Sequence, residues 1–136
     1  MNQIIGIVGM FILLFSISCA DHDGPETEAD RIGVGASCAT DADCPQPADE
    51  DAPREVCLLD FNGGYCGLEN CTANADCPYG SACVAHTNGV NYCFRICLDK
   101  AECNLRREPD VQSNCSSNIV FVEPQTNVKA CVPPSS

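Results

Sequence analysis

Large apolar and basic side chains are scarce in this chain of 136 residues, which has no tryptophan and only seven lysines and arginines. After the first 20 residues, Leu, Ile, Val and Phe together fill 20 of 116 positions, or 17%. So little aliphatic side chain excludes a large enzyme domain, a parallel α/β sheet and a polytopic membrane protein. The net charge of -12 excludes nucleic acid as a partner, because nucleic-acid binding needs a basic surface.

Cysteine is abundant instead, with 13 in total and 12 after the first 20 residues. Low aliphatic content with high net charge is typical of disorder, but about one cysteine in ten residues is typical of a small secreted disulfide scaffold. Disulfides form in oxidising compartments outside the cytoplasm. The composition therefore predicts a small disulfide-rich fold with little regular secondary structure, in an extracytoplasmic protein.

The N-terminal segment is uncharged and apolar, and residues 1–18 resemble a secretory signal peptide. The apolar stretch is shorter than the roughly 20 residues of a membrane-spanning helix. Phe15-Ser16-Ile17-Ser18-Cys19 partly resembles a bacterial lipobox, which implies that Cys19 is the mature N-terminus and carries lipid. Cleavage after Ala20 and an uncleaved signal anchor are the alternatives. Removal or modification of Cys19 leaves 12 cysteines, an even number that can pair completely.

The next segment, residues 19–37, is rich in acidic and small side chains, with five acids against Arg31. A segment with almost no large apolar side chain cannot bury itself. We therefore expect an acidic flexible tether between the lipid anchor and the folded part of the protein.

From Cys38 onward the cysteines form three blocks of four, over residues 38–66, 71–93 and 97–131. In each block, five residues separate the first cysteine from the second. All three of these gaps also end with alanine and then an acid directly before the second cysteine, namely Asp43, Asp76 and Glu102. Three matches at one offset indicate tandem repeats.

Each repeat is predicted to consist of a short helical turn followed by a β-hairpin. Polar caps and alanine in the first gap suit one helical turn. In the first two blocks, Asn62-Gly63 and Asn88-Gly89 lie between strand-forming residues, and Asn-Gly is a strong hairpin signal. In the third block, residues 119–122 and 128–132 flank a turn at 123–127. Neither piece is stable alone in water, so disulfides must supply the stability.

We expect each block to close on itself through two disulfides. In a helical first gap the first two cysteines are about 9 Å apart along the axis, which exceeds the roughly 4.4–6.8 Å between the Cα atoms of a disulfide. This leaves first-to-third with second-to-fourth pairing, or first-to-fourth with second-to-third. We adopt the former, which gives Cys38–Cys57, Cys44–Cys66, Cys71–Cys83, Cys77–Cys93, Cys97–Cys115 and Cys103–Cys131.

The second block reads Cys71-x5-Cys77-Pro-x-Gly-x2-Cys83, followed by a hairpin to Cys93, and resembles the four-cysteine repeats of bacterial surface lipoproteins. In outline the blocks are also similar to Dickkopf N-terminal and EB-type extracellular modules. The resemblance covers residues 38–131 and lies in the cysteine spacing. It implies an extracellular, non-enzymatic protein used in adhesion or ligand binding.

No catalytic, metal or cofactor site is expected. His86, the only histidine in the repeats, is interpreted as an exposed loop residue, because a catalytic pair needs a nucleophile and an orienting acid. Zinc sites use closely spaced cysteine pairs, and the only such pair, Cys93 and Cys97, joins two blocks. Asp41, Asp43 and the acids at 49–51 form no Asp-x-Asp-x-Asp-Gly loop for calcium, so we expect a solvated acidic surface.

The leading hypothesis is an exported, lipid-anchored, cysteine-rich surface protein that acts as a binding or structural module. Its partners are the membrane, through the lipid on Cys19, and an unidentified extracellular protein or glycan. The alternative is a freely secreted disulfide-rich inhibitor of an extracellular protease. In that case the loop between Cys103 and Cys115 offers an exposed basic sequence, Arg106-Arg107, to the protease.

Overall fold

The structure, a computed structural model, describes residues 25–136. The predicted signal peptide (1–18) and Cys19, the predicted site of lipid attachment, lie outside these residues. The helices are α1 (Glu28–Ile32), η1 (Asp41–Asp43), η2 (Asn74–Asp76) and α2 (Lys100–Cys103). The strands are β1 (Val56–Cys57), β2 (Cys66–Gly67), β3 (Ser81–Ala85), β4 (Asn91–Cys97), β5 (Asn114–Ser116), β6 (Val120–Phe121) and β7 (Lys129–Val132). Within the described range, no helix is long and apolar enough to span a membrane.

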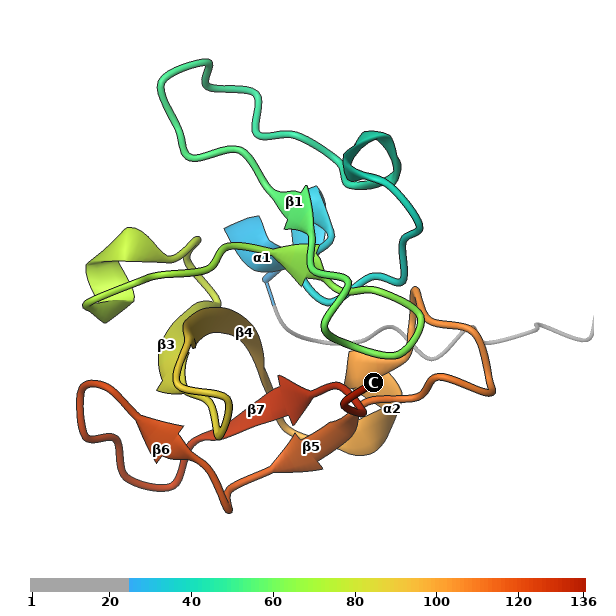
Figure 1. Ribbon diagram of the computed structural model, residues 1–136. Coiled ribbons are helices and arrows are strands. Elements are labelled where there is room, and N and C mark those ends of the chain that lie inside the picture. Colours follow the sequence, from blue (N-terminus) through green and yellow to red (C-terminus); the bar gives the residue numbers. More distant parts are fainter. Residues whose placement is uncertain (1–24) are drawn as a thin grey trace, which may run out of the picture.

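The strands form two antiparallel sheets (Figure 1). β1 pairs with β2 in the smaller sheet, and the larger sheet has the strand order β5-β7-β4-β3-β6. β3 and β4 form the hairpin expected around Asn88-Gly89, where Gly89 has a φ of 86°. Glycine adopts this left-handed conformation without steric cost, which is why Asn-Gly suits a tight hairpin turn.

Six disulfides use all the cysteines of residues 25–136, and each bridge lies within one block. The first cysteine is bonded to the third and the second to the fourth, which is one of the two pairings that the helical spacing leaves open and the one adopted above. The third and fourth cysteines also face each other across paired strands, as Cys57 with Cys66, Cys83 with Cys93, and Cys115 with Cys131. Each strand pair is therefore bonded to both ends of the short helix that precedes it.

The acid before the second cysteine has the same role in all three blocks, because it accepts hydrogen bonds from backbone N–H groups just after the first cysteine. These bonds run from Ala39 and Thr40 to Asp43, from Thr72 and Ala73 to Asp76, and from Leu98 to Glu102, at 2.7–3.0 Å. Backbone hydrogen bonds to the charged form lower the pKa of Asp43 and of Asp76. The recurrence of the acid is thus explained by its role at the start of each helix.

The three blocks share one hydrophobic core, in addition to a small cluster of buried cysteines in each block. Its aromatic rings meet mostly edge to face, with 5.9 Å between the ring centroids of Phe61 and Tyr65 and 5.7 Å between those of Phe61 and Phe94. The first block supplies Phe61 and Tyr65, the second supplies Tyr92, and the third supplies Ala130, while Phe94 directly follows the second block. Burial of large aromatic side chains across block boundaries joins the blocks into one folding unit.

The hairpin expected in the third block is wrong. β6 pairs with β3 of the second block, with Phe121 opposite Val84 and Val120 opposite Ala85. β7 lies between β5 and β4 and pairs with both. The apolar pattern predicted where β6 and β7 occur in the sequence. It did not predict their partners, because strand pairing depends on packing against residues from other parts of the chain.

The expectation of a flexible acidic tether is wrong for residues 25–37. Thr27 caps α1, since its hydroxyl accepts a hydrogen bond from the Asp30 N–H while its own N–H donates to the Asp30 carboxylate. Three apolar side chains of this segment are buried in the shared core: Ala29, Ile32 and Val34. Few apolar residues are enough here, because nearly all of them lie on the side that faces the core.

Loss of one bridge is expected to destabilise the whole molecule, because the blocks share a core. In the chain-entropy model, Cys71–Cys83, with a separation of 12 residues, is worth about 3 kcal/mol, and Cys103–Cys131, with a separation of 28, about 3.5 kcal/mol. We expect the double variants C71S/C83S and C103S/C131S to unfold in one urea transition at lower midpoints than the unmodified protein. Two resolved transitions would contradict the shared core.

Candidate functional site

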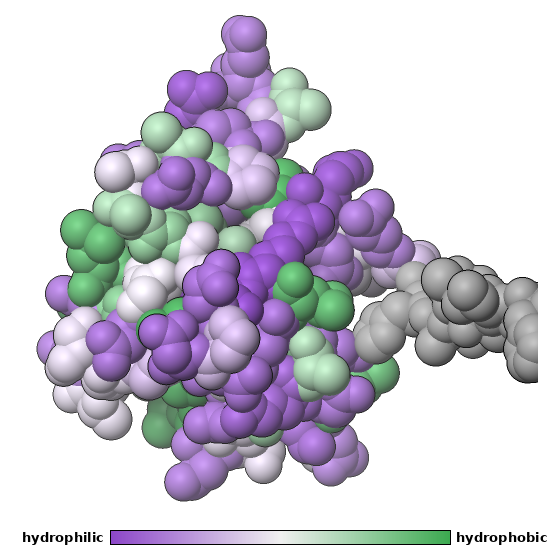
Figure 2. Space-filling view, turned by 90° about the vertical axis from the view of Figure 1, so that its right-hand side faces the viewer, coloured by the Kyte–Doolittle hydropathy of each residue, from purple (hydrophilic) through white to green (hydrophobic). Residues whose placement is uncertain are grey.

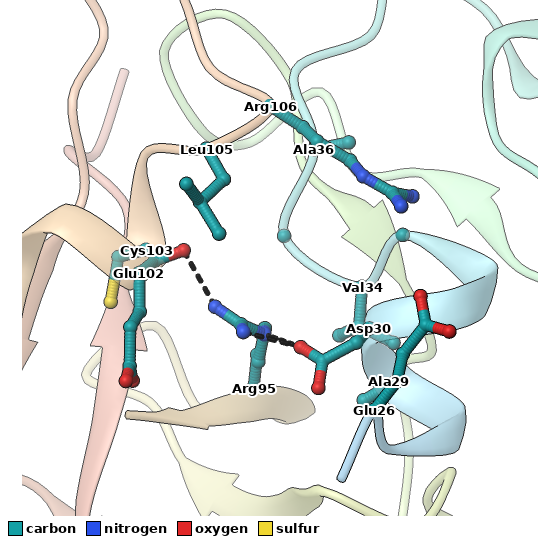
Figure 3. Close-up of a pocket in the computed structure, with 12 residues that line it drawn as sticks. Glu26, Ala29, Asp30, Val34, Ala36, Arg95, Glu102, Cys103, Leu105 and Arg106 are labelled. Atoms are coloured by element: carbon teal, nitrogen blue, oxygen red, sulfur yellow. Dashed lines mark hydrogen bonds and ion pairs between the residues drawn. The ribbon is translucent and has the colours of Figure 1, made fainter. Parts of the chain in front are cut away.

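A pocket with a volume of ≈ 280 Å³ lies where α1 and the residues after it meet α2 and the residues after it (Figure 3). Its lining comes from two stretches far apart in the sequence, residues 26–36 and 102–106, and from Arg95 in β4. Ser37 holds the two stretches together, because its N–H donates a hydrogen bond of 3.0 Å to the carbonyl oxygen of Arg106. The cysteine spacing and the charge pattern did not predict a site at this place.

The floor of the pocket contains an ion pair between Arg95 and Asp30. The Arg95 Nε–H donates to Asp30 Oδ1 at 2.6 Å, Nη2 also contacts this oxygen, and Nη1 donates to the Glu102 carbonyl at 2.6 Å. Burial by itself raises the pKa of Asp30, but hydrogen bonds from Thr27 and the charge of Arg95 outweigh it, so the pKa is lowered. The carboxylate is charged at neutral pH, and the pair links α1 to β4 and α2.

The rim of the pocket carries one base, one acid and one apolar side chain. Arg106 and Leu105 follow α2, and Glu26 precedes α1. Leu105 is 69% exposed. A Cβ atom added at Gly33 would lie 2.9 Å from Nη1 of Arg106. Glycine at this position therefore allows the guanidinium to lie against the backbone that follows α1.

The surface visible from the right-hand side of Figure 1 is mostly hydrophilic, with hydrophobic residues in separate groups (Figure 2). Large exposed apolar side chains include Leu98 and Leu105 at the two ends of α2. Extended apolar patches mark many protein-binding surfaces. A mixed surface of this kind fits recognition by charge and by a small pocket better than docking through a broad apolar face.

Arg107 does not belong to an exposed basic loop, contrary to the expectation from the sequence. It is only 8% exposed, and the central carbon of its planar guanidinium lies 5.9 Å from the centroid of the Tyr65 ring. The guanidinium donates hydrogen bonds of 2.8–3.1 Å to the carbonyl oxygens of Gly35, Asn62, Gly64 and Val111. Arg107 thus joins the segment before the first block, the first block and the loop of the third.

Arg106 is exposed, but its backbone is not presented as the backbone of a protease substrate is. Its carbonyl oxygen accepts hydrogen bonds from both the N–H and the hydroxyl of Ser37, at 3.0 and 3.2 Å. A substrate-like inhibitor needs this carbonyl free to enter the oxyanion hole of the protease. The loop between Cys103 and Cys115 is therefore held to the rest of the protein at the carbonyl of Arg106.

His86 is half-buried rather than exposed. Its ring packs edge to face on Phe61, with 5.4 Å between the centroids, and lies 5.7 Å from the Tyr92 ring. The Tyr92 hydroxyl accepts a hydrogen bond from the Asn88 side chain and donates one to Asp60. Its position at the edge of the aromatic core gives His86 a packing role.

The cysteines weighed as metal ligands are all paired, and two of the acids accept hydrogen bonds from the backbone. Among residues 25–136, every group of at least three possible ligand atoms within 4.8 Å consists of the first, second and fourth cysteines of one block. These sulfurs belong to disulfides, whereas metals bind thiolates. Asp41 Oδ1 accepts a hydrogen bond of 2.8 Å from the Cys57 N–H, and Asp49 Oδ1 accepts one from Asp51.

Glu55 is a buried acid that the sequence analysis missed. It is 1% exposed, and neither carboxylate oxygen has a hydrogen-bond partner among the described residues. Burial raises the pKa of Glu55 to about 8, and the negative charge of Glu28 contributes to this. The side chain is therefore protonated at neutral pH. It lies in the most acidic part of the chain, where nothing in the pattern of residues distinguishes a buried acid from a solvated one.

Comparisons with protein-family models, curated proteins and solved structures found no match. The chemistry of the chain itself must therefore support any assignment of function. Its six disulfides point to an extracytoplasmic, oxidising environment.

Replacement of Arg107 by lysine is expected to destabilise the protein by about 2–3 kcal/mol, because one ammonium cannot donate to carbonyls in four directions and buried charges need full pairing. Chemical denaturation of R107K measures the effect. R106K is the matched control and should change stability by less than about 0.5 kcal/mol. Equal stability of the two variants would show that the buried hydrogen bonds of Arg107 contribute little.

Replacement of Glu55 by glutamine should change how stability depends on pH. The carboxyl group titrates near 4.5 in the unfolded chain and at about 8 in the folded protein. Between these values the folded state binds more protons, so stability falls as pH rises, by up to about 1.4 kcal/mol per pH unit. E55Q removes this loss and should exceed the unmodified protein in stability at pH 8 more than at pH 5.

The measurement is urea unfolding of E55Q and the unmodified protein across this pH range. Glu50 is exposed, so E50Q serves as the control and should follow the unmodified protein. Parallel pH profiles for E55Q and E50Q would mean that Glu55 is ionised in the folded protein.

Proposed function

We propose that the protein is exported and acts outside the cytoplasm as a non-enzymatic, cysteine-rich binding module, anchored by a lipid on Cys19. The disulfides are the observation that carries this proposal. All 12 cysteines of residues 25–136 are paired, and nine of them are buried, so the bridges are part of the core. A fold that depends on so many bridges requires an oxidising compartment.

The proposal includes an origin of the fold as three tandem copies of one unit, a short helix followed by a strand pair. Two shared features support it: the crossed disulfides, and the acid that accepts hydrogen bonds at the start of the helix. The third copy departs from the unit, because β6 has moved to the edge of the sheet beside β3. In a solenoid, each repeat contacts only its neighbours in a stack. The three copies in this protein instead pack around one shared core.

The binding role is supported by the pocket between α1 and α2. A pocket lined by a few charged groups and an apolar wall is the usual form of a small-ligand site. Its floor and walls are held by the ion pair of Arg95 with Asp30 and by the bridge from Cys103 to Cys131. A ligand could therefore bind in this pocket without a prior rearrangement of the protein.

The lipid anchor rests on the sequence around Cys19. Two or more acyl chains on one residue hold a protein stably on a membrane, whereas one chain gives reversible binding. Since α1 is packed into the core, the stretch between Cys19 and α1 consists of residues 20–27, at most about 28 Å when fully extended. An anchored molecule would therefore stay close to the membrane surface.

The inhibitor alternative has lost its main support, because Arg107 is buried and the carbonyl of Arg106 is bonded to Ser37. Free secretion after cleavage behind Ala20 remains the alternative to anchoring. The two differ in the mass of the mature chain and in its location. Both agree with the disulfides, so the N-terminus decides between them.

The mature protein purified from producing cells is expected to begin with a lipid-modified Cys19. C19S should lose the lipid and be released from the membrane fraction, since a hydroxyl cannot take the thioether-linked lipid. S18A keeps a small residue before the cysteine and should remain anchored. Intact-mass analysis and membrane fractionation provide the measurements. An unmodified chain that begins at Asp21 would overturn the anchor and establish free secretion.

A further inference from the structure

Two charged side chains at the rim of the pocket between α1 and α2 lack partners. Among the described residues, neither the Arg106 guanidinium nor the Glu26 carboxylate makes a hydrogen bond or an ion pair. Figure 3 shows their charged ends pointing toward one another on one side of the pocket. In the floor, by contrast, Arg95 and Asp30 neutralise each other. The pocket therefore presents one available positive and one available negative group.

An apolar wall lies beside these charges. Leu105 projects into the pocket from the side of α2 (Figure 3), and Val34 and Ala36 line the opposite side. Leu105 is 69% exposed, so much of its apolar surface is open to a ligand. Covering this surface would add a hydrophobic contribution to binding.

The backbone around the pocket is held in place. The Val34 N–H donates to the Ala29 carbonyl and the Gly35 N–H to the Cys66 carbonyl, both at 2.9 Å, and Ser37 bonds to Arg106. These bonds fix the positions from which the rim side chains project. A preorganised site loses less entropy when it binds a ligand.

We propose that this pocket binds a small zwitterion with an apolar side chain, of the class of free α-amino acids. The carboxylate would bond to Arg106, the ammonium to Glu26, and the side chain would cover Leu105. This inference rests on the proposed binding function and names its ligand class. The volume of ≈ 280 Å³ is just below the range of about 300–1,000 Å³ for drug-sized ligands, which suits so small a molecule.

The charge arrangement favours a zwitterion over ligands of one sign. An anion would satisfy Arg106 but would bring its charge next to Glu26, and a cation would meet the reverse problem. Opposite charges on one ligand satisfy both groups and add two charge-assisted hydrogen bonds. An uncharged apolar ligand would leave both rim groups to lose water without compensation.

The test is a titration of the oxidised protein with L-leucine, followed by amide NMR. N-acetyl-L-leucine, which lacks the ammonium, and L-leucinamide, which lacks the carboxylate, are the matched probes. We expect saturable shifts for L-leucine at residues 33–36 and 105–106. Each probe should bind more weakly than L-leucine by a factor of roughly ten or more, since each lacks one charged contact. The absence of saturable shifts with L-leucine, or equal binding of all three compounds, would overturn the proposal.

Two variants assign the charged ends of the ligand. R106Q should bind L-leucine and L-leucinamide equally, and E26Q should bind L-leucine and N-acetyl-L-leucine equally. R106Q keeps the backbone hydrogen bonds to Ser37, so its fold is expected to persist. R54Q and E50Q, exposed positions that do not line the pocket, serve as controls and should retain the selectivity of the unmodified protein. Loss of selectivity in these controls as well would contradict recognition by the rim charges.

A third pair of variants tests the apolar wall. L105N should weaken the binding of L-leucine, whereas L98N, at another exposed leucine that does not line the pocket, should leave it unchanged. Equal effects of L105N and L98N would contradict the assigned side-chain contact. Failure of these binding tests does not affect the lipid at Cys19, which intact mass measures, so the two proposals can fail separately.

Discussion

In each block, two crossed disulfides hold a strand pair against both ends of a short helix, and the other contacts depend on this constraint. Helices of three to five residues and strands of two to seven are too short to persist alone. The few aliphatic side chains cannot offset the ordering entropy of the chain. Within that covalent frame, Asp43, Asp76 and Glu102 add hydrogen bonds at equivalent places, so that one local solution is used three times.

The blocks become one molecule through contacts that cross their boundaries. Aromatic rings from the first two blocks pack together, β6 of the third block extends the sheet beside β3, and Arg107 bonds carbonyls of the first block from within the third. A buried guanidinium has enough donors to serve several carbonyls at once, which suits a chain with many irregular loops. The disulfides therefore stabilise each block, and the shared core holds the blocks together.

The contacts within each block could be predicted from the sequence, whereas the contacts between blocks could not. With a helical gap, the cysteine spacing excludes a bond between the first two cysteines of a block and leaves two pairings, and Asn88-Gly89 marks a turn, because both depend on neighbouring residues. The partner of β6, the burial of Arg107 and the neutral state of Glu55 depend on residues far away in the sequence. The segment before Cys38 was misjudged because its average composition is polar, although the positions of Ala29 and Ile32 place both in the core. The pocket could not be predicted either, because its lining comes from residues that are far apart in the sequence.

The electrostatics of the pocket follow from how few bases the chain has. Of seven lysines and arginines against 19 acids, Arg95 is paired with Asp30 and Arg107 is buried against carbonyls. Of the five bases that remain, Arg106 is the one that lines the pocket. An anionic group is repelled by most of the surface and attracted where Arg106 lies, while Glu26 on the same rim selects against anions that carry no ammonium. The overall acidity thus adds to the selectivity of this one site.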